Sequence, residues 1–261
     1  MLEIKDLTIQ YGDKPPVVEN FSLSLKKGEI ITIVGESGSG KSTVLSSILG
    51  LLPNGGKIIS GDIIYNGESM LSKSLNQWRE LRGTEITMIS QDSGGTLNPI
   101  RKIGKQFVEY IQTHSKISAE EAEEKAKDMF SKVNLPDPEI IMKSYPHQLS
   151  GGMKQRVGIA MALTFHPKII LADEPTSALD VITQAQIVKE IMDLRKKFDT
   201  SIIMVTHNLG VAAYISDKII VMQNGKIVDA GNKNEVIENP KSEYTKKLLE
   251  AVPEIGGERL V

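Results

Sequence analysis

Residues 35–43 read Gly35-Glu36-Ser37-Gly38-Ser39-Gly40-Lys41-Ser42-Thr43 and match the pattern G-x-x-x-x-G-K-[ST]. The short apolar run Ile30–Val34 before it is typical of a buried parallel strand, and the spacing of Ser42–Leu52 after it predicts a helix. Glycines let successive backbone N–H groups turn toward a phosphate, and the start of the helix adds a favourable dipole. The sequence therefore predicts a phosphate-binding loop in an α/β core.

Individual residues of this loop have expected roles. Lys41 should reach the β- and γ-phosphates of a nucleotide, and the Ser42 hydroxyl should ligate Mg²⁺. The loop residues expected to contact the nucleotide are Gly35, Ser37, Gly38, Ser39, Gly40, Lys41, Ser42 and Thr43. The alternative is a glycine-rich turn with an incidental lysine, which the flanking strand and helix disfavour.

A second apolar run, Lys168–Glu174, ends in two carboxylates. A protein with such a loop needs an acid at a neighbouring strand tip to hold Mg²⁺, usually through its water, and Asp173 fits this role. Glu174 follows, where a carboxylate is able to accept the proton of an attacking water. The alternative is a polar strand end that faces solvent, and it is the weaker interpretation after a phosphate-binding loop.

Composition limits the class of protein. The 261 residues are 40% hydrophobic and 25% charged, which is ordinary for a globular domain. A net charge of −2 does not favour a nucleic-acid partner, and the lack of cysteine excludes disulfides and thiolate metal sites. Apolar runs fall far short of the ~20 residues that cross a bilayer, and the acidic first 20 residues are unlike a signal peptide. We expect a soluble cytosolic chain that serves a membrane only through a partner.

The first third of the chain alternates between apolar and polar residues. This alternation predicts strands of an antiparallel sheet with one solvated face. It covers Leu2–Ile4, Leu7–Tyr11, where the apolar positions shift by one residue, and Phe21–Leu25. Asp62–Tyr65 followed by Asn66-Gly67 predicts a strand that enters a type I′ turn.

The middle of the chain has helical spacing. Ser118 with Glu121 predicts a capping box, and three prolines, Pro136, Pro138 and Pro146, predict a loop. Beyond it we expect a helix at Val181–Phe198, a strand at Ser201–His207 and a hairpin at Asp217–Asp229. The expected division is an α/β core with an antiparallel β-subdomain (1–97 and 166–235), an inserted helical subdomain (98–165) and a short tail (236–261).

Leu149-Ser150-Gly151-Gly152-Met153 followed by Lys154-Gln155-Arg156 resembles the signature motif of ATP-binding cassette (ABC) proteins. Physically it is a second anion cradle, because a serine and two glycines open a helix whose first N–H groups are free. In this family the cradle faces the γ-phosphate held by the other subunit. The resemblance implies the fold of an ABC nucleotide-binding domain, the cofactors ATP and Mg²⁺, and contact of Ser150, Gly151 and Gly152 with ATP.

Four more positions match the family. Tyr11 matches the aromatic residue that stacks on adenine, although a strand aromatic packed in the sheet is an alternative. Gln91 resembles the glutamine that touches Mg²⁺ or the attacking water, where the membrane partner docks. Ser177–Asp180, with Asp180 at its end, resembles the loop that crosses the dimer interface, and His207 resembles the switch histidine at the γ-phosphate.

Two stretches resemble the ATPases of oligopeptide, dipeptide and nickel importers. They are Asp92–Pro99, with its Leu-Asn-Pro, and Glu238–Leu249, with its Asn-Pro…Tyr-Thr…Leu-Leu. Ser93–Thr96 departs from the proline-rich lead usual in that group. The short ending without cysteine is compatible with nickel and metallophore members.

The resemblance implies an ATPase subunit that powers uptake of oligopeptides or dipeptides, with the same role for nickel or a metal-metallophore as the alternative. The implied partners are two transmembrane permease subunits, a second ABC ATPase (a copy or a paralogue) in a head-to-tail dimer, and indirectly an extracytoplasmic solute-binding protein. We expect the chain at the cytoplasmic face of the membrane. A DNA-repair or translation ATPase and a small-molecule kinase are the alternatives from other classes, and the signature motif argues against the kinase.

Overall fold

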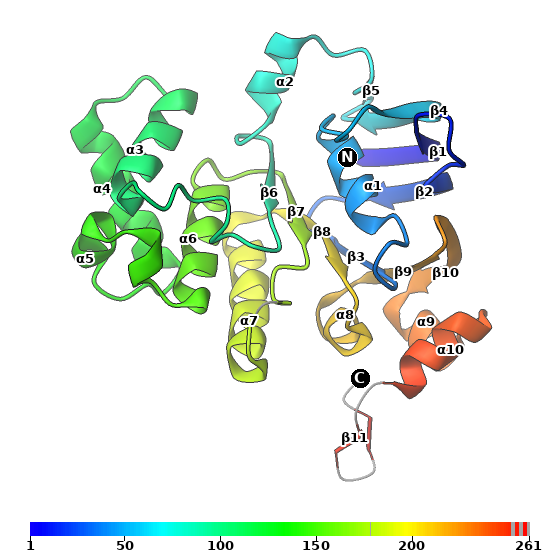
Figure 1. Cartoon of the computed structure of the whole chain (residues 1–261). Coiled ribbons are helices and arrows are strands. Elements are labelled where there is room, and N and C mark those ends of the chain that lie inside the picture. Colours follow the sequence, from blue (N-terminus) through cyan, green and yellow to red (C-terminus); the bar gives the residue numbers. More distant parts are fainter. Residues whose placement is uncertain (178, 252–253, 256–257, 260–261) are drawn as a thin grey trace. The chain divides into compact units, whose positions relative to one another are not determined.

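A computed structural model describes residues 1–177, 179–251, 254–255 and 258–259 (Figure 1). The chain forms two compact units, one from residues 1–78 and 201–261 and the other from residues 79–200. The predicted helical segment 98–165 lies inside the second unit, and the division of the chain predicted from sequence stays a prediction. Among the helices of the described residues, none is both long and apolar enough to cross a membrane.

The first unit contains the expected antiparallel sheet, in the order β2-β1-β4-β5. Its strands are β1 (Leu2–Tyr11), β2 (Val18–Leu25), β4 (Gly56–Tyr65) and β5 (Glu68–Ser69). The shifted phase in the sequence has a cause, since the β1–β2 register breaks between Ile4 and Leu7, where Asp6 is left-handed with φ 47°. Asn66 and Gly67 both have positive φ, 52° and 86°, which confirms the predicted type I′ geometry.

The same unit holds four strands in the order β10-β9-β3-β8. They are β3 (Ile30–Val34), β8 (Ser201–Thr206), β9 (Lys218–Gln223) and β10 (Lys226–Asn232). The strand β3 is parallel to β8 and β9, and every residue of β3 and β8 is buried, as their apolar sequences predict. The hairpin around Asn224 and Gly225 is present, but β10 ends at Asn232 rather than at Asp229.

The helix after the phosphate-binding loop, α1 (Lys41–Ile48), is shorter than the predicted Ser42–Leu52. Gly50 ends it in the left-handed conformation, with φ 61°, and a Cβ there would lie 2.6 Å from the ring of Trp78. The remaining helices of this unit are α8 (Leu209–Ile215), α9 (Lys233–Glu238) and α10 (Glu243–Glu250). The short strands β11 (Glu254–Ile255) and β12 (Glu258–Arg259) pair with each other.

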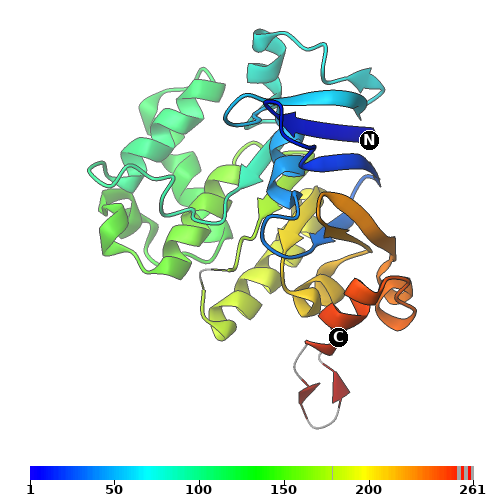
Figure 2. The ribbon, with the colours of Figure 1, turned by 45° about the vertical axis from the view of Figure 1, so that its right-hand side comes forward.

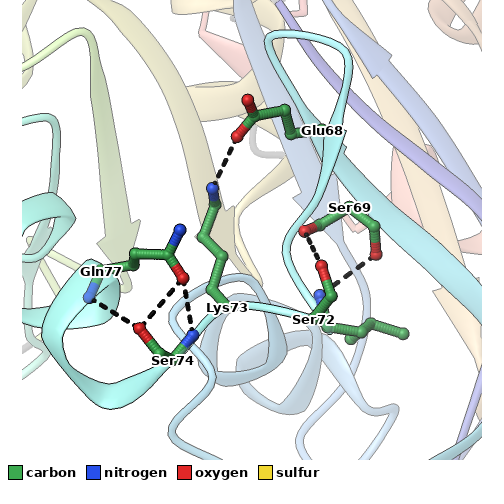
Figure 3. A network of polar contacts seen from close by, with 7 residues as sticks. Glu68, Ser69, Ser72, Lys73, Ser74 and Gln77 are labelled. Carbon is green, nitrogen blue, oxygen red and sulfur yellow. Dashed lines mark hydrogen bonds and ion pairs between the residues drawn. The ribbon is translucent and has the colours of Figure 1, made fainter.

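A polar network leads from β5 into the helix α2 (Leu75–Leu81), which spans the boundary between the units (Figure 3). Ser74 and Gln77 cap the start of α2, since the Ser74 N–H donates to Gln77 Oε1 at 2.8 Å and the Gln77 N–H donates to Ser74 Oγ at 3.4 Å. Lys73, whose side chain is 9% exposed, pairs with Glu68 at 3.0 Å. These contacts attach the helix to the strand before it.

The second unit contains two parallel strands and a group of helices, drawn in colours from green to yellow-green in Figure 2. The elements are β6 (Ile86–Ile89), α3 (Ile103–His114), α4 (Ala119–Lys132), α5 (Pro138–Lys143), the 3-10 turn η1 (Pro146–Gln148), α6 (Gly151–Leu163), β7 (Ile169–Asp173) and α7 (Val181–Phe198). Phe107 and Phe130 join α3 to α4, with ring centroids 5.2 Å apart. The capping box of Ser118 and Glu121 is present.

The predicted proline loop is wrong in one respect. Pro138 begins α5, because proline is tolerated in the first turn of a helix, where its missing N–H has no intrahelical acceptor. Pro146 begins the turn η1 in the same way.

Candidate nucleotide-binding site

The loop Gly35–Thr43 connects β3 to α1 and is packed tightly at two glycines. A Cβ at Gly35 would lie 2.2 Å from the carbonyl oxygen of Met222, and a Cβ at Gly40 would lie 2.8 Å from that of Val17. Backbone atoms do not move aside cheaply, so both positions require glycine. The buried floor of the loop is therefore held against β9 and against the residue before β2.

The outer part of the loop suits a polyphosphate. Gly38 has φ 82°, and nothing lies within 4 Å of a Cβ added there. Lys41 is 4% exposed, and its Nζ donates to the carbonyl oxygens of Gly35 and Glu36 at 2.7 Å each. The helix α1 begins at Lys41, so its first N–H groups, which have no acceptor within the helix, belong to the end of the same loop. An open cradle with a buried cation fits the phosphates of a nucleotide.

His207 and the phosphate-binding loop directly follow the carboxyl ends of the neighbouring strands β8 and β3. Val34, the last residue of β3, pairs with Thr206, the last residue of β8, in parallel register. Since carboxyl ends of parallel strands meet at one edge, the structure brings the start of the loop and the exposed His207 together.

Tyr11 closes β1 and is half-buried. Its ring lies against Gly56 of β4, where a Cβ would be 2.6 Å from Cε1. This packing accounts for an aromatic residue in the sheet, and stacking of Tyr11 on adenine stays a prediction.

The carboxylates of the second unit lie at a strand end beside Gln91. Ile89, the last residue of β6, pairs with Ala172 of β7, so the exposed Gln91 and the half-buried Asp173, which is the last residue of β7, lie at the carboxyl ends of adjacent parallel strands. Glu174 has φ 43°, an uncommon conformation for a residue with a side chain. Such backbone strain clusters at functional sites, which is the physical reason to single out Glu174.

The signature motif opens α6, and the loop before α7 lies next to it. Ser150 caps α6 by accepting the N–H of Met153 at 3.3 Å. A Cβ at Gly152 would lie 3.0 Å from Cγ2 of Thr183, and the carboxylate of Asp180 accepts the N–H of Thr183 at 3.0 Å. These hydrogen bonds from the backbone and the hydroxyl of Thr183 lower the pKa of Asp180. The structure therefore brings together Ser150–Gly152 and Asp180, while Ala178 lies outside the described residues.

The sequence did not predict that the loop after Gln91 packs against α6. A Cβ at Gly158 would lie 2.6 Å from Oγ and 2.7 Å from Cβ of Ser93, which is 3% exposed. A glycine inside a helix costs about 1 kcal/mol relative to alanine, and this cost is the signal by which the sequence marks a close approach. The contact joins the segment that follows Gln91 to the helix that carries the signature motif.

An ion pair between α6 and α7 also lies outside the predicted set. Arg156 of α6 donates from Nη2 to Glu190 of α7 at 2.9 Å and from Nε at 3.1 Å, and both side chains are largely buried. Two parallel bonds fix the orientation of a guanidinium group better than one does. The pair therefore holds the signature helix α6 on α7.

Comparison with known proteins gives one consistent result. The ABC transporter family profile matches residues 18–177. The oligopeptide transport ATP-binding protein OppD of Bacillus subtilis (strain 168) is 45% identical over 257 residues, covering 97% of this chain and 72% of that protein. The metal-staphylopine import ATP-binding protein CntD of Staphylococcus aureus (strain NCTC 8325 / PS 47) is 41% identical, covering 95% and 92%. The dimeric ATP-binding cassette MJ0796 bound to ADP and Pi superposes with a TM-score of 0.77 at 29% identity, covering 89% and 99%.

Proposed function

Because this chain belongs to the ABC transporter family and is an ATPase of that family, we propose that it powers the uptake of oligopeptides or dipeptides by an importer. The likeness to the oligopeptide transport ATP-binding protein of Bacillus subtilis, which extends over nearly the whole chain, carries this proposal. The Leu-Asn-Pro of Asp92–Pro99 and the motif of Glu238–Leu249 support it, since both lie in the chain where that group of importers has them.

The site residues divide the work of hydrolysis. ATP binds with its phosphates at the loop Gly35–Thr43, where Lys41 and the loop amides face the negative charge. Ser42, Gln91 and Asp173 are the proposed ligands of Mg²⁺, which when bound supplies a Lewis acid to the transferred phosphoryl group.

Two residues act on the water and on the terminal phosphate. Glu174 accepts the proton of the attacking water, a step for which its carboxylate at the end of β7 is suited. His207 contacts the γ-phosphate from the end of β8, next to the strand that carries the phosphate-binding loop. Tyr11 stacks on adenine.

The signature motif supports a head-to-tail dimer. Ser150 and Gly151 are exposed at the start of α6, so the first N–H groups of this helix are accessible to another molecule. These groups and Gly152 face the γ-phosphate in a second ABC ATPase, either a copy of this chain or a paralogue. Asp180 lies at that interface.

The second unit offers a surface for the membrane partner. The segment Gln91–Pro99 leads to Ile100, which is 82% exposed, and then to a groove of about 680 Å³ between α3, α4 and α5. Four cationic side chains line this groove, Arg101, Lys102, Lys105 and Lys143. A helix of a permease subunit binds at this segment. Through the two permease subunits of the importer, the chain is held at the cytoplasmic face of the membrane and serves an extracytoplasmic solute-binding protein.

The test is to purify the importer through an affinity tag on this chain, identify its subunits and reconstitute it in proteoliposomes with its solute-binding protein. A mixture of di- to hexapeptides should stimulate ATP hydrolysis, and ATP should drive peptide uptake. A complex that carries Lys41→Ala is the control and should show neither. Hydrolysis that no peptide stimulates would contradict peptide uptake while leaving the ATPase assignment in place.

A metal-metallophore importer is the second candidate, favoured by the likeness to the staphylopine import protein. In that case nickel or another divalent metal, offered with a metallophore, should stimulate the same complex. Stimulation by the metal complex and not by peptides would replace the first candidate with this one.

A further inference from the structure

The motif in Glu238–Leu249 contains a tyrosine that contacts the phosphate-binding loop. Tyr244 lies on α10 and packs against a cluster of buried residues that includes Val34 and Leu249. Val34 is the last residue of β3, and the loop begins at the next position. The motif therefore lies against the base of the loop, although the two are more than 200 residues apart in sequence.

One hydrogen bond joins them directly. The backbone N–H of Glu36 donates to the hydroxyl oxygen of Tyr244 at 2.9 Å. Tyr244 is half-buried, and its hydroxyl oxygen accepts a hydrogen bond from this protein group. The N–H of an exposed loop residue is thereby held in one orientation.

The same peptide group is held on its other side by the lysine of the loop. The N–H of Glu36 and the carbonyl of Gly35 belong to one planar peptide unit, so they move together. The carbonyl oxygen of Gly35 accepts from Nζ of Lys41 at 2.7 Å. Tyr244, this peptide and Lys41 form a continuous chain of hydrogen bonds, and bonds in such a chain strengthen one another.

The position of Tyr244 is fixed by the sheet. Asp229 of β10 is 5% exposed, and its carboxylate accepts the N–H groups of Lys241 at 2.8 Å and Ser242 at 3.3 Å. Ser242 in turn caps α10 by accepting the N–H of Thr245 at 3.0 Å. The start of α10 is thus attached to a buried carboxylate, and Tyr244 lies in the first turn after it.

We infer that Tyr244 is a positioning residue of the nucleotide site, whose hydroxyl orients the Gly35–Glu36 peptide and, through it, the ammonium group of Lys41. This inference rests on the proposed function, because it requires ATP in the loop Gly35–Thr43. The C-terminal motif is then a part of the ATP site rather than a separate appendage.

Tyr244→Phe tests this directly, because it removes one oxygen and keeps the ring that packs on the cluster. The matched control is Tyr214→Phe, on α8, where the side chain is 61% exposed. Titration calorimetry with MgATP should show a Kd that rises about fivefold in Tyr244→Phe, the equivalent of one hydrogen bond, and stays within about twofold in Tyr214→Phe. The unfolding temperatures without nucleotide should agree within about 4 °C, which separates positioning from a general loss of stability.

A double-mutant cycle then tests the route through the lysine. In a Lys41→Met background, Tyr244→Phe should change the Kd for MgATP by less than about twofold, because the group that Tyr244 positions is gone. Equal Kd values for the two tyrosine variants would overturn the inference, and so would a full fivefold effect that persists without Lys41. A wild-type chain that binds no MgATP would instead remove the proposed nucleotide site itself, an outcome that the wild-type titration reveals before any variant is compared.

Discussion

Nζ of Lys41 lies 2.7 Å from the carbonyl oxygen of Gly35, at the opposite end of the same loop. The side chain is 4% exposed, so its charge is almost removed from water. Hydrogen bonds to neutral carbonyls stabilise a buried ammonium group less than hydrogen bonds to anionic oxygens do. The buried ammonium group of Lys41 should therefore be stabilised when phosphate oxygens bind in the loop.

Lys41→Ala should weaken ATP binding and reduce hydrolysis by the assembled importer on the order of a hundredfold or more, since the transition state loses a fixed counter-charge. The measurement is phosphate release by the reconstituted complex, with the Kd for MgATP of the purified chain beside it. Turnover equal to that of the wild type would remove Lys41 from the site.

Glu174→Gln should keep ATP binding and stop turnover, because the amide has nearly the same shape and accepts no proton. The trapped product should be a closed dimer with ATP bound, seen by size-exclusion chromatography with light scattering. The isoelectronic change leaves the strained backbone at Glu174 in place, so loss of fold should not accompany loss of rate. A monomer with persistent hydrolysis would exclude Glu174 as the general base.

Replacement of Gly94 and Gly95 by alanine should impair coupling and spare nucleotide binding. The added Cβ atoms would lie 2.8 Å from Cδ of Lys154 and 2.5 Å from Oδ2 of Asp92, so two flexible side chains must move at the surface of this segment. We expect an unchanged Kd for MgATP in the isolated chain and a severalfold loss of solute-stimulated ATPase in the complex.

The matched control for this pair is Gly61→Ala in β4, where the Cβ would collide with the carbonyl oxygen of Lys5 in the antiparallel sheet of the first unit. It should lower the unfolding temperature without changing the ratio of stimulated to basal ATPase. Equal losses in the isolated chain and the complex for Gly94→Ala with Gly95→Ala would assign the segment to folding or hydrolysis and not to coupling.

Stability should fall at acidic pH because of His114. Its ring lies beside those of Tyr110 and Phe165, with centroids 5.2 Å and 5.5 Å away, and burial lowers its pKa. The unfolded chain then binds a proton more readily, so the contribution of His114 is present above the unfolded pKa of about 6.5. It is lost as pH falls below that value and through the lower pKa of the folded state. Urea titrations at pH 7.5 and 5.5 should show a smaller change for His114→Gln than for the wild type. An identical change in both proteins would sink this assignment.

Much of the fold follows from neighbouring residues alone. The phosphate-binding loop between a strand and a helix is present as predicted, and so are the capping box at Ser118 and the turn at Asn66-Gly67. Each depends on a few adjacent residues whose backbone preferences or reciprocal hydrogen bonds are local. The family, predicted from the signature motif at Leu149–Met153 together with the phosphate-binding loop, and the fold class are confirmed. The roles of the individual site residues, Tyr11 and Gln91 among them, stay predictions.

Two predicted boundaries are wrong, because the preferences of neighbouring residues do not by themselves decide where a helix begins or ends. The helix α1 ends at Ile48 because Gly50 adopts a positive φ beneath Trp78, a residue too distant for periodicity to include. Pro138 begins a helix rather than ending one, because its effect depends on whether it falls in the first turn.

Consecutive residues were enough to specify the chemistry of this chain, because phosphate cradles, caps and turns are built from groups that are already neighbours along the backbone. The tertiary structure alone decided which distant segments hold those groups in place. Ser93 against Gly158 and Tyr244 against Glu36 each depend on a close approach between elements, and no spacing within either element encodes it. Such contacts form only when buried strands and helices pack at native density, since a shift of one side chain's width removes them.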